Sequence, residues 1–213
     1  MLQGRLYADG MTVAVRRISR HGVAPGQLTL EGIEPAPSAS DHVFFAIHPT
    51  APVAERVTQL ALRWRAEHRM QGNVFDADRF HVTLLPFGNH SGLPLDVIDM
   101  ASRAIAAITV PPFDISFDRI ANFGQGIVVL RGSKDAPALI ALRQKLVTEA
   151  WKAGYKGDVQ RGYTPHMTLM YGDKVTPEQL IEPVTWTVRE VVLVHSLQGQ
   201  HMHRILKRWP LQS

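Results

Sequence analysis

One feature constrains this chain more than any other: a short motif of histidine, an apolar residue, threonine and leucine occurs twice. The copies are residues 81–84 (His-Val-Thr-Leu) and 166–169 (His-Met-Thr-Leu). Successive side chains of a strand point to opposite faces, so the histidine and threonine of each copy share one face. The apolar residue and the leucine occupy the other face. We therefore expect two strands, each with one side in a core and an imidazole and a hydroxyl together on the opposite side. Two copies are far stronger evidence than one.

The spacing of the two copies favours two related halves. The two histidines lie 85 residues apart (166 minus 81), about half of the regularly patterned part of the chain. If the halves face each other across a cleft, the two imidazoles approach opposite sides of one bound group.

From Asp41 onward the hydrophobic pattern predicts a mixture of helices and strands. Strands are expected over residues 43–47, 79–86, 113–120, 127–130, 163–171, 184–194 and 203–209, and helices from Pro52 to about Gly72, over 95–108 and over 137–151. Asn122, Gly124 and Gly126 supply a turn that joins two of the strands into a hairpin. Hairpin-like pairs without a steady alternation of strand and helix favour an α+β fold with largely antiparallel sheets.

Residues 1–40 differ from the rest of the chain. Glycine, proline and serine interrupt every long period there, so we expect an N-terminal extension, irregular or forming a short hairpin between 11–18 and 27–33. Residues 41–213 then form one two-lobed domain.

Composition narrows the chemistry. The chain of 213 residues has no cysteine, which excludes disulfides, thiolate zinc sites and cysteine nucleophiles. A net charge of +4 and ten histidines favour an anionic ligand such as a nucleotide or an RNA end. The sequence shows neither a signal-peptide pattern nor an apolar window long enough to span a bilayer, so we expect a cytoplasmic protein without a membrane partner.

The paired motifs suit cleavage of a phosphodiester without a metal or cofactor. A neutral histidine can take a proton from water while a protonated one donates to the departing oxygen, and an ordinary histidine pKa near 6.5 allows both forms near neutrality. Thr83 and Thr168 can donate hydrogen bonds to the non-bridging phosphate oxygens. The candidate catalytic residues are therefore His81 and His166, with the two threonines as phosphate ligands.

At these residues the chain resembles the 2H phosphoesterase superfamily, and within it the bacterial 2′,5′ RNA ligase-like, RNA 2′,3′-cyclic phosphodiesterase branch. The resemblance runs from about Asp41 to Leu211. Besides the motifs it includes residues 44–47, 87–88, 123–124, 192–196, 206 and 209–211. It implies two lobes of antiparallel sheet with helices outside and the motifs in the cleft between them.

The resemblance also implies an activity. Its members open 2′,3′-cyclic phosphates to 2′-phosphates, in some cases with reversible 2′,5′ ligation. By this analogy His81 is the acid toward the departing 3′ oxygen and His166 is the base toward water. The implied partners are RNA ends or nucleotides that carry a cyclic phosphate, and we expect a monomer.

The chain departs from its relatives at two places. Many relatives have a small residue and an arginine after the second motif, where this chain has Met170 and Tyr171. His203 stands where a tyrosine is common. Candidate substrate contacts are Arg161 for a phosphate, the rings of Phe87, Phe123 and Tyr171 for a base, and His203.

Three alternatives remain open. The chain could be a non-catalytic nucleotide- or RNA-binding module on the same fold, although binding alone does not need two proton-transfer groups. It could be a metal-dependent hydrolase that uses His201 and His203. The motif histidines could also be structural.

Overall fold

The computed structural model describes residues 40–134, 136–157, 159, 162–197, 199–200 and 202–213, together with strands β1 (Tyr7–Ala8) and β2 (Met11–Thr12). These two short strands pair with each other in antiparallel fashion. The expected hairpin between 11–18 and 27–33 reaches outside the described residues. The division into an extension and a domain stays a prediction.

Eight further strands form one antiparallel sheet in the order β10-β9-β3-β4-β7-β6-β5-β8. Its strands are β3 (Asp41–Ile47), β4 (Val82–His90), β5 (Phe113–Phe123), β6 (Ile127–Arg131), β7 (His166–Tyr171), β8 (Gln179–Val188), β9 (Glu190–Leu197) and β10 (Met202–Pro210). The helices are α1 (Ala51–Glu67), the 3-10 turn η1 (Ala77–Arg79), α2 (Leu95–Ala106) and α3 (Pro137–Lys152). The expected α+β class is confirmed, as is the β5–β6 hairpin.

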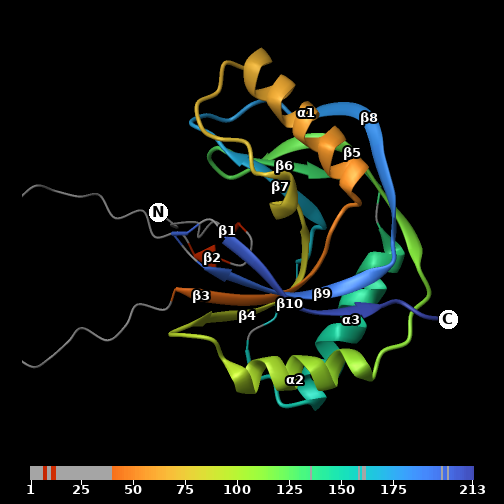
Figure 1. The fold of residues 1–213 in the computed structure, drawn as a ribbon. Helices are drawn as coiled ribbons and strands as arrows, with labels where there is room; N and C mark the ends of the chain where they lie inside the picture. The colour runs from red at the N-terminus through yellow and green to blue at the C-terminus, as the bar shows by residue number, and fades with distance from the viewer. Residues whose placement is uncertain are drawn as a thin grey trace, which may run out of the picture.

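The sheet is divided in the middle. Strands β4 and β7 share only one paired position, Val82 with Met167, whereas every other pair of neighbouring strands is joined over a longer stretch. We call β10-β9-β3-β4 the first lobe and β7-β6-β5-β8 the second lobe. Figure 1 shows α2 and α3 beside the first lobe and α1 beside the second, so the helices lie outside. The two motif strands are the ones that meet at the division.

Two of the helices pack against the lobe opposite to the strand that they follow in the chain. Helix α1 follows β3 of the first lobe but packs against β7 and β8 of the second, and α3 follows β6 of the second lobe but packs against β4 and α2. Proline in the first turn of α1 and of α3 is favourable, because an N–H there would have no partner within the helix. Helix α1 ends earlier than the expected Gly72, since Arg69 adopts a left-handed backbone conformation (φ 47°).

One predicted strand is two strands. The pattern over 184–194 belongs to β8 up to Val188 and to β9 from Glu190, and these strands lie in different lobes. Apolar residues continue across Arg189, so local periodicity does not reveal that the chain changes lobe there.

The apolar sides of the motifs are in the core. Val82, Leu84, Met167 and Leu169 are all at most 1% exposed and belong to the main hydrophobic cluster. The first lobe has a second, smaller cluster made of Phe44, Ala46, Val192 and Val194. Among the described helices, none is long and apolar enough to cross a membrane.

Candidate active site

Each motif histidine makes the same kind of hydrogen bond, from its ring nitrogen Nδ1 to the carbonyl oxygen of the residue two positions before it. In His81, Nδ1 lies 2.7 Å from the carbonyl oxygen of Arg79, and in His166 it lies 2.8 Å from that of Thr164. A carbonyl oxygen only accepts, so Nδ1 carries the proton and donates in both cases. This fixes the ring orientation and leaves Nε2 of each imidazole for proton transfer.

The register of the central strands brings the motifs together. Val82 pairs with Met167, so continuing the antiparallel register by one residue each way sets His81 opposite Thr168 and Thr83 opposite His166. Opposite residues share a face, and here it is the face away from the paired apolar residues. We call these four residues the motif cluster: each histidine lies across from the threonine of the other copy.

His81 is surrounded by rings. It is 5% exposed, and its ring centroid lies 5.0 Å from that of Phe44, 5.1 Å from that of His203 and 6.2 Å from that of His48. A cavity of about 60 Å³ is lined by His81, Phe44, His203 and Tyr171 among others. Two of the candidate substrate contacts, Tyr171 from the second lobe and His203 from the first, thus share a cavity with His81.

His48 is a neighbour of the site that the sequence reasoning missed. Ile47 pairs with Val82, so His48 follows next to His81 across the β3–β4 register. Its Nε2 is buried and has no hydrogen-bond partner among the described residues. Burial, with smaller contributions from the positive charges of His81 and Arg208, lowers the pKa of His48 to about 4. His48 is therefore a neutral imidazole near neutral pH.

His166 has different surroundings. It is half-buried, and its ring centroid lies 4.7 Å from that of Phe123, another candidate substrate contact. In the neighbouring strand β6, Arg131 pairs directly with His166 of β7. The second lobe thus adds one aromatic ring and one guanidinium to the neighbourhood of His166.

Thr83 contributes to the motif cluster a hydroxyl that no hydrogen bond among the described residues ties to the fold. Its Oγ1 is buried and has no partner within the described part of the chain. A buried hydroxyl that lacks a partner costs free energy, so it is ready to bond with a ligand oxygen. Thr168, at 3% exposed, is the other hydroxyl of the cluster.

A buried tyrosine links the two motifs. The Tyr163 hydroxyl, three residues before His166, donates to the carbonyl oxygen of Thr83 at 2.9 Å. The guanidinium of Arg143 lies 4.4 Å from the centre of the tyrosine ring, and its Nε donates to the carbonyl oxygen of Leu84 at 3.1 Å. Burial raises the pKa of Tyr163, which keeps its hydroxyl protonated as a donor. This link supplements the single paired position of β4 and β7, and no pattern in the sequence indicates it.

One of the other candidates does not reach the motif cluster. Phe87 is 5% exposed and packs in the core against Phe45 and Tyr155, contrary to its expected role as a substrate contact. Its strand position places the ring on the core side. Arg161, the expected phosphate contact, and His201 lie outside the described residues. Within the described ranges, no group of three or more His, Cys, Asp or Glu side chains is placed to hold a metal ion.

Comparisons with known proteins agree on one family. A family model described as the 2′-5′ RNA ligase superfamily matches residues 63–200. Escherichia coli LigT in its apo form is 27% identical, with 83% of this chain and 100% of that chain covered and a TM-score of 0.64. LigT complexed with 3′-AMP is 26% identical, with 81% and 99% covered and a TM-score of 0.65. A structure described as a phosphoesterase, 24% identical, covers 82% of this chain and 99% of its own with a TM-score of 0.67, which shows the shared fold. None of the proteins with curated descriptions matches the sequence.

Proposed function

The chain belongs to the 2′-5′ RNA ligase superfamily of 2H phosphoesterases, and from this premise we propose that it opens 2′,3′-cyclic phosphates of RNA ends or nucleotides to 2′-phosphates without a metal. The observation that carries the proposal is the motif cluster: two imidazoles with equivalent Nδ1 bonds on strands that the pairing of Val82 with Met167 brings together.

In the proposed reaction the two histidines have opposite roles. Nε2 of His166 takes a proton from water, and the water oxygen forms a bond to phosphorus. The bond between phosphorus and the 3′ oxygen breaks, and Nε2 of His81 gives its proton to that oxygen. The carbonyls of Arg79 and Thr164 accept from Nδ1 of the rings, which holds them in place during the transfer.

The threonines stabilise charge. The hydroxyls of Thr83 and Thr168 donate hydrogen bonds to the non-bridging oxygens as negative charge grows in the transition state. The buried Thr83 Oγ1, which has no partner among the described residues, supports this role. If a 5′ hydroxyl takes the place of water, the same forward step makes a 2′,5′ linkage: Nε2 of His166 takes the hydroxyl proton, the hydroxyl oxygen bonds to phosphorus, the bond to the 3′ oxygen breaks, and Nε2 of His81 protonates that oxygen.

Nucleotides are the substrate class that the relatives support. Structures of LigT complexed with 3′-AMP and with ATP show that this relative binds nucleotides. Both motifs come from one chain, so we propose that the protein acts as a monomer. We propose the cytoplasm as its compartment, because RNA ends and nucleotides occur there.

The test is a product analysis. The purified protein is incubated in a strong chelator with 2′,3′-cyclic nucleotides and RNAs that end in a cyclic phosphate, and the phosphate isomer is identified. We expect 2′-phosphates only, with turnover lost in His81→Ala and in His166→Ala while nucleotide affinity is largely kept. Release of 3′-phosphate alone contradicts the role of His81, and loss of activity in the chelator contradicts the metal-free mechanism. Binding without turnover by the unaltered protein indicates a binding module instead.

A further inference from the structure

Two arginines occupy the positions in register with His166 on the next two strands of the second lobe, and the three residues form a row across those strands. Arg131 of β6 pairs with His166, and Arg119 of β5 pairs with Arg131. Directly opposite residues in neighbouring strands share a face, so both guanidiniums project from the same face as the His166 imidazole. The arginines therefore begin one strand away from the proposed base.

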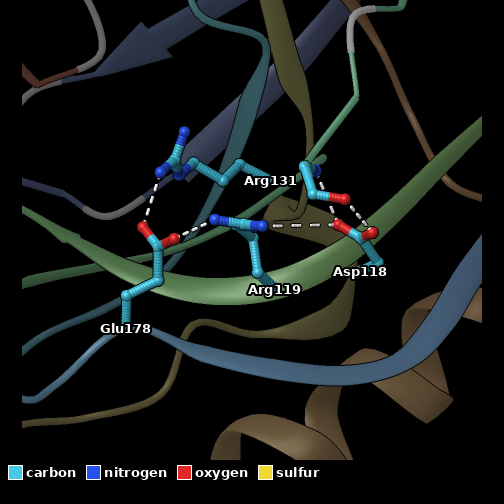
Figure 2. A network of polar contacts seen from close by, with 5 residues as sticks. Asp118, Arg119, Arg131 and Glu178 are labelled. Atoms are coloured by element: carbon cyan, nitrogen blue, oxygen red, sulfur yellow. Dashed lines mark hydrogen bonds and ion pairs between the residues drawn. The ribbon is translucent and has the colours of Figure 1, made fainter.

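A single carboxylate holds both arginines. Figure 2 shows Glu178 bonded through one oxygen to Arg131, at 2.5 Å, and through the other to Arg119. Its pKa is lowered mainly by the hydrogen bond from Arg131. The neighbouring Asp118 has its own partner, because it accepts from the backbone N–H of Ser133 at 2.6 Å and lies 4.0 Å from Arg119. Glu178 is thus the carboxylate that both guanidiniums share.

Solvent reaches the group formed by Glu178 and the two arginines. Glu178 is 38% exposed and the arginines 25% and 28%, so a ligand can reach the group. The Nε atoms of Arg119 and Arg131 are buried, and that of Arg119 faces Asp118, so the donors for a ligand are the terminal nitrogens that now bind Glu178. A cavity of about 200 Å³ reaches this group at Arg131 alone, and its other lining residues include Lys134 and residues 164–165, which precede His166.

We propose that Arg131 and Arg119 form a subsite for a second phosphate of the substrate, and that Glu178 occupies this subsite when no substrate is bound. A carboxylate and a phosphate bind the planar guanidinium fork in the same way, so one replaces the other. Exposed ion pairs contribute little to stability, so the exchange costs little. The inference rests on the proposed function and specifies its substrate: a strand or nucleotide with another phosphate near its cyclic phosphate.

The experiment compares three substrates: a 2′,3′-cyclic mononucleotide, the same nucleotide with a 5′-phosphate, and a dinucleotide with one internal phosphodiester and a terminal cyclic phosphate. The unaltered protein is expected to turn over both two-phosphate substrates with a kcat/KM roughly tenfold or more above that of the first, through a lower KM. A preference for the dinucleotide alone assigns the subsite to an RNA strand, and a preference for the 5′-phosphate alone assigns it to a nucleotide.

Variants separate the subsite from a structural ion pair. Arg131→Gln is expected to remove most of the preference, whereas Arg63→Gln, which removes one exposed charge from α1, leaves the preference intact. Glu178→Gln acts in the opposite direction and lowers the KM of the two-phosphate substrates. A purely structural pair predicts that Arg131→Gln and Glu178→Gln lower thermal stability alike and change no preference.

The outcomes of the two proposals are distinguishable. If no cyclic phosphate is hydrolysed, the proposed function fails. If all three substrates are hydrolysed with equal kcat/KM, or if Arg131→Gln lowers kcat/KM equally for all three, the function stands and the second-phosphate subsite is wrong.

Discussion

The two motif histidines share a sequence pattern and a hydrogen bond, but their surroundings differ. His81 is almost fully buried among the rings of Phe44, His48 and His203, whereas His166 is half-buried beside Phe123 and Arg131. The motif therefore fixes how each imidazole is oriented, and the lobe decides what surrounds it. Because the two motifs supply the same histidine and threonine, different roles for the histidines have to come from the lobes.

The two lobes carry different side chains on the faces that bear the motif histidines. The first lobe carries the apolar cluster of Phe44, Ala46, Val192 and Val194, and the ring of Phe44 lies against His81. The second lobe carries Arg119, Arg131 and Glu178 in the row of His166. The surroundings of His81 are thus mostly rings, whereas His166 has one ring, Phe123, and an arginine beside it.

Removal of the two imidazoles, singly and together, is expected to have the largest effect and tests whether the two histidines act in one step. His81→Ala and His166→Ala should each lower kcat by about 10² to 10⁴, the range typical of a lost acid or base. Because both groups act in one step, the double variant should be little slower than the slower single variant. The measurement is kcat on a cyclic nucleotide for all four proteins. Multiplied losses would mean that the histidines act independently.

The buried imidazole of the first site gives the next largest effect. The folded pKa of His48 is about 4, below the ordinary value of 6.5, so between these values the unfolded chain binds a proton that the folded protein does not. The free energy of unfolding should therefore fall as the pH drops from about 6.5 to about 4, by up to roughly 3 kcal/mol. His48→Gln should remove this part of the slope in urea unfolding between pH 7 and pH 4.

His68→Gln is the matched control for His48→Gln, because it makes the same substitution at the end of helix α1, which lies beside the second lobe. If His48→Gln unfolds with the same pH dependence as the unaltered protein, the two lobes do not differ in this respect.

The smallest effect concerns the hydroxyl of the first motif. Thr83→Val should lower kcat/KM about tenfold, since one donor to the phosphate is lost. The free energy of unfolding should stay the same or rise, because the variant removes a buried hydroxyl that has no partner in the described part of the chain. Thermal unfolding and kinetics of Thr83→Val and Thr168→Val test this together. A clear loss of stability in Thr83→Val would show that its hydroxyl serves the fold.

Local pattern was enough for most of the helices and strands and for the motifs, but not for the boundary between β8 and β9 or the end of α1. The helices α2 and α3 follow from apolar residues at helical spacing, and the motif strands follow from alternation over only a few residues. These features depend on neighbours in the chain, so the sequence contains them directly.

Long-range pairing was beyond the sequence pattern. The expected strand over 127–130 stops one residue before Arg131, and only the β6–β7 register reveals that this arginine lies beside His166. The sequence pattern places His48 just after the end of an expected strand and Tyr163 within another. The role of each depends on a partner at least 30 residues away, which periodicity does not specify.

Strand β3 has a consequence for biosynthesis. All seven of its residues are buried, and its two neighbours are β4 and β9, so one flank is completed only by residues 190–197. A nascent chain that has not yet released β9 presents β3 as an apolar strand with unpaired N–H and C=O groups, which invites pairing with another polypeptide. Chains stalled before Glu190 are therefore expected to aggregate.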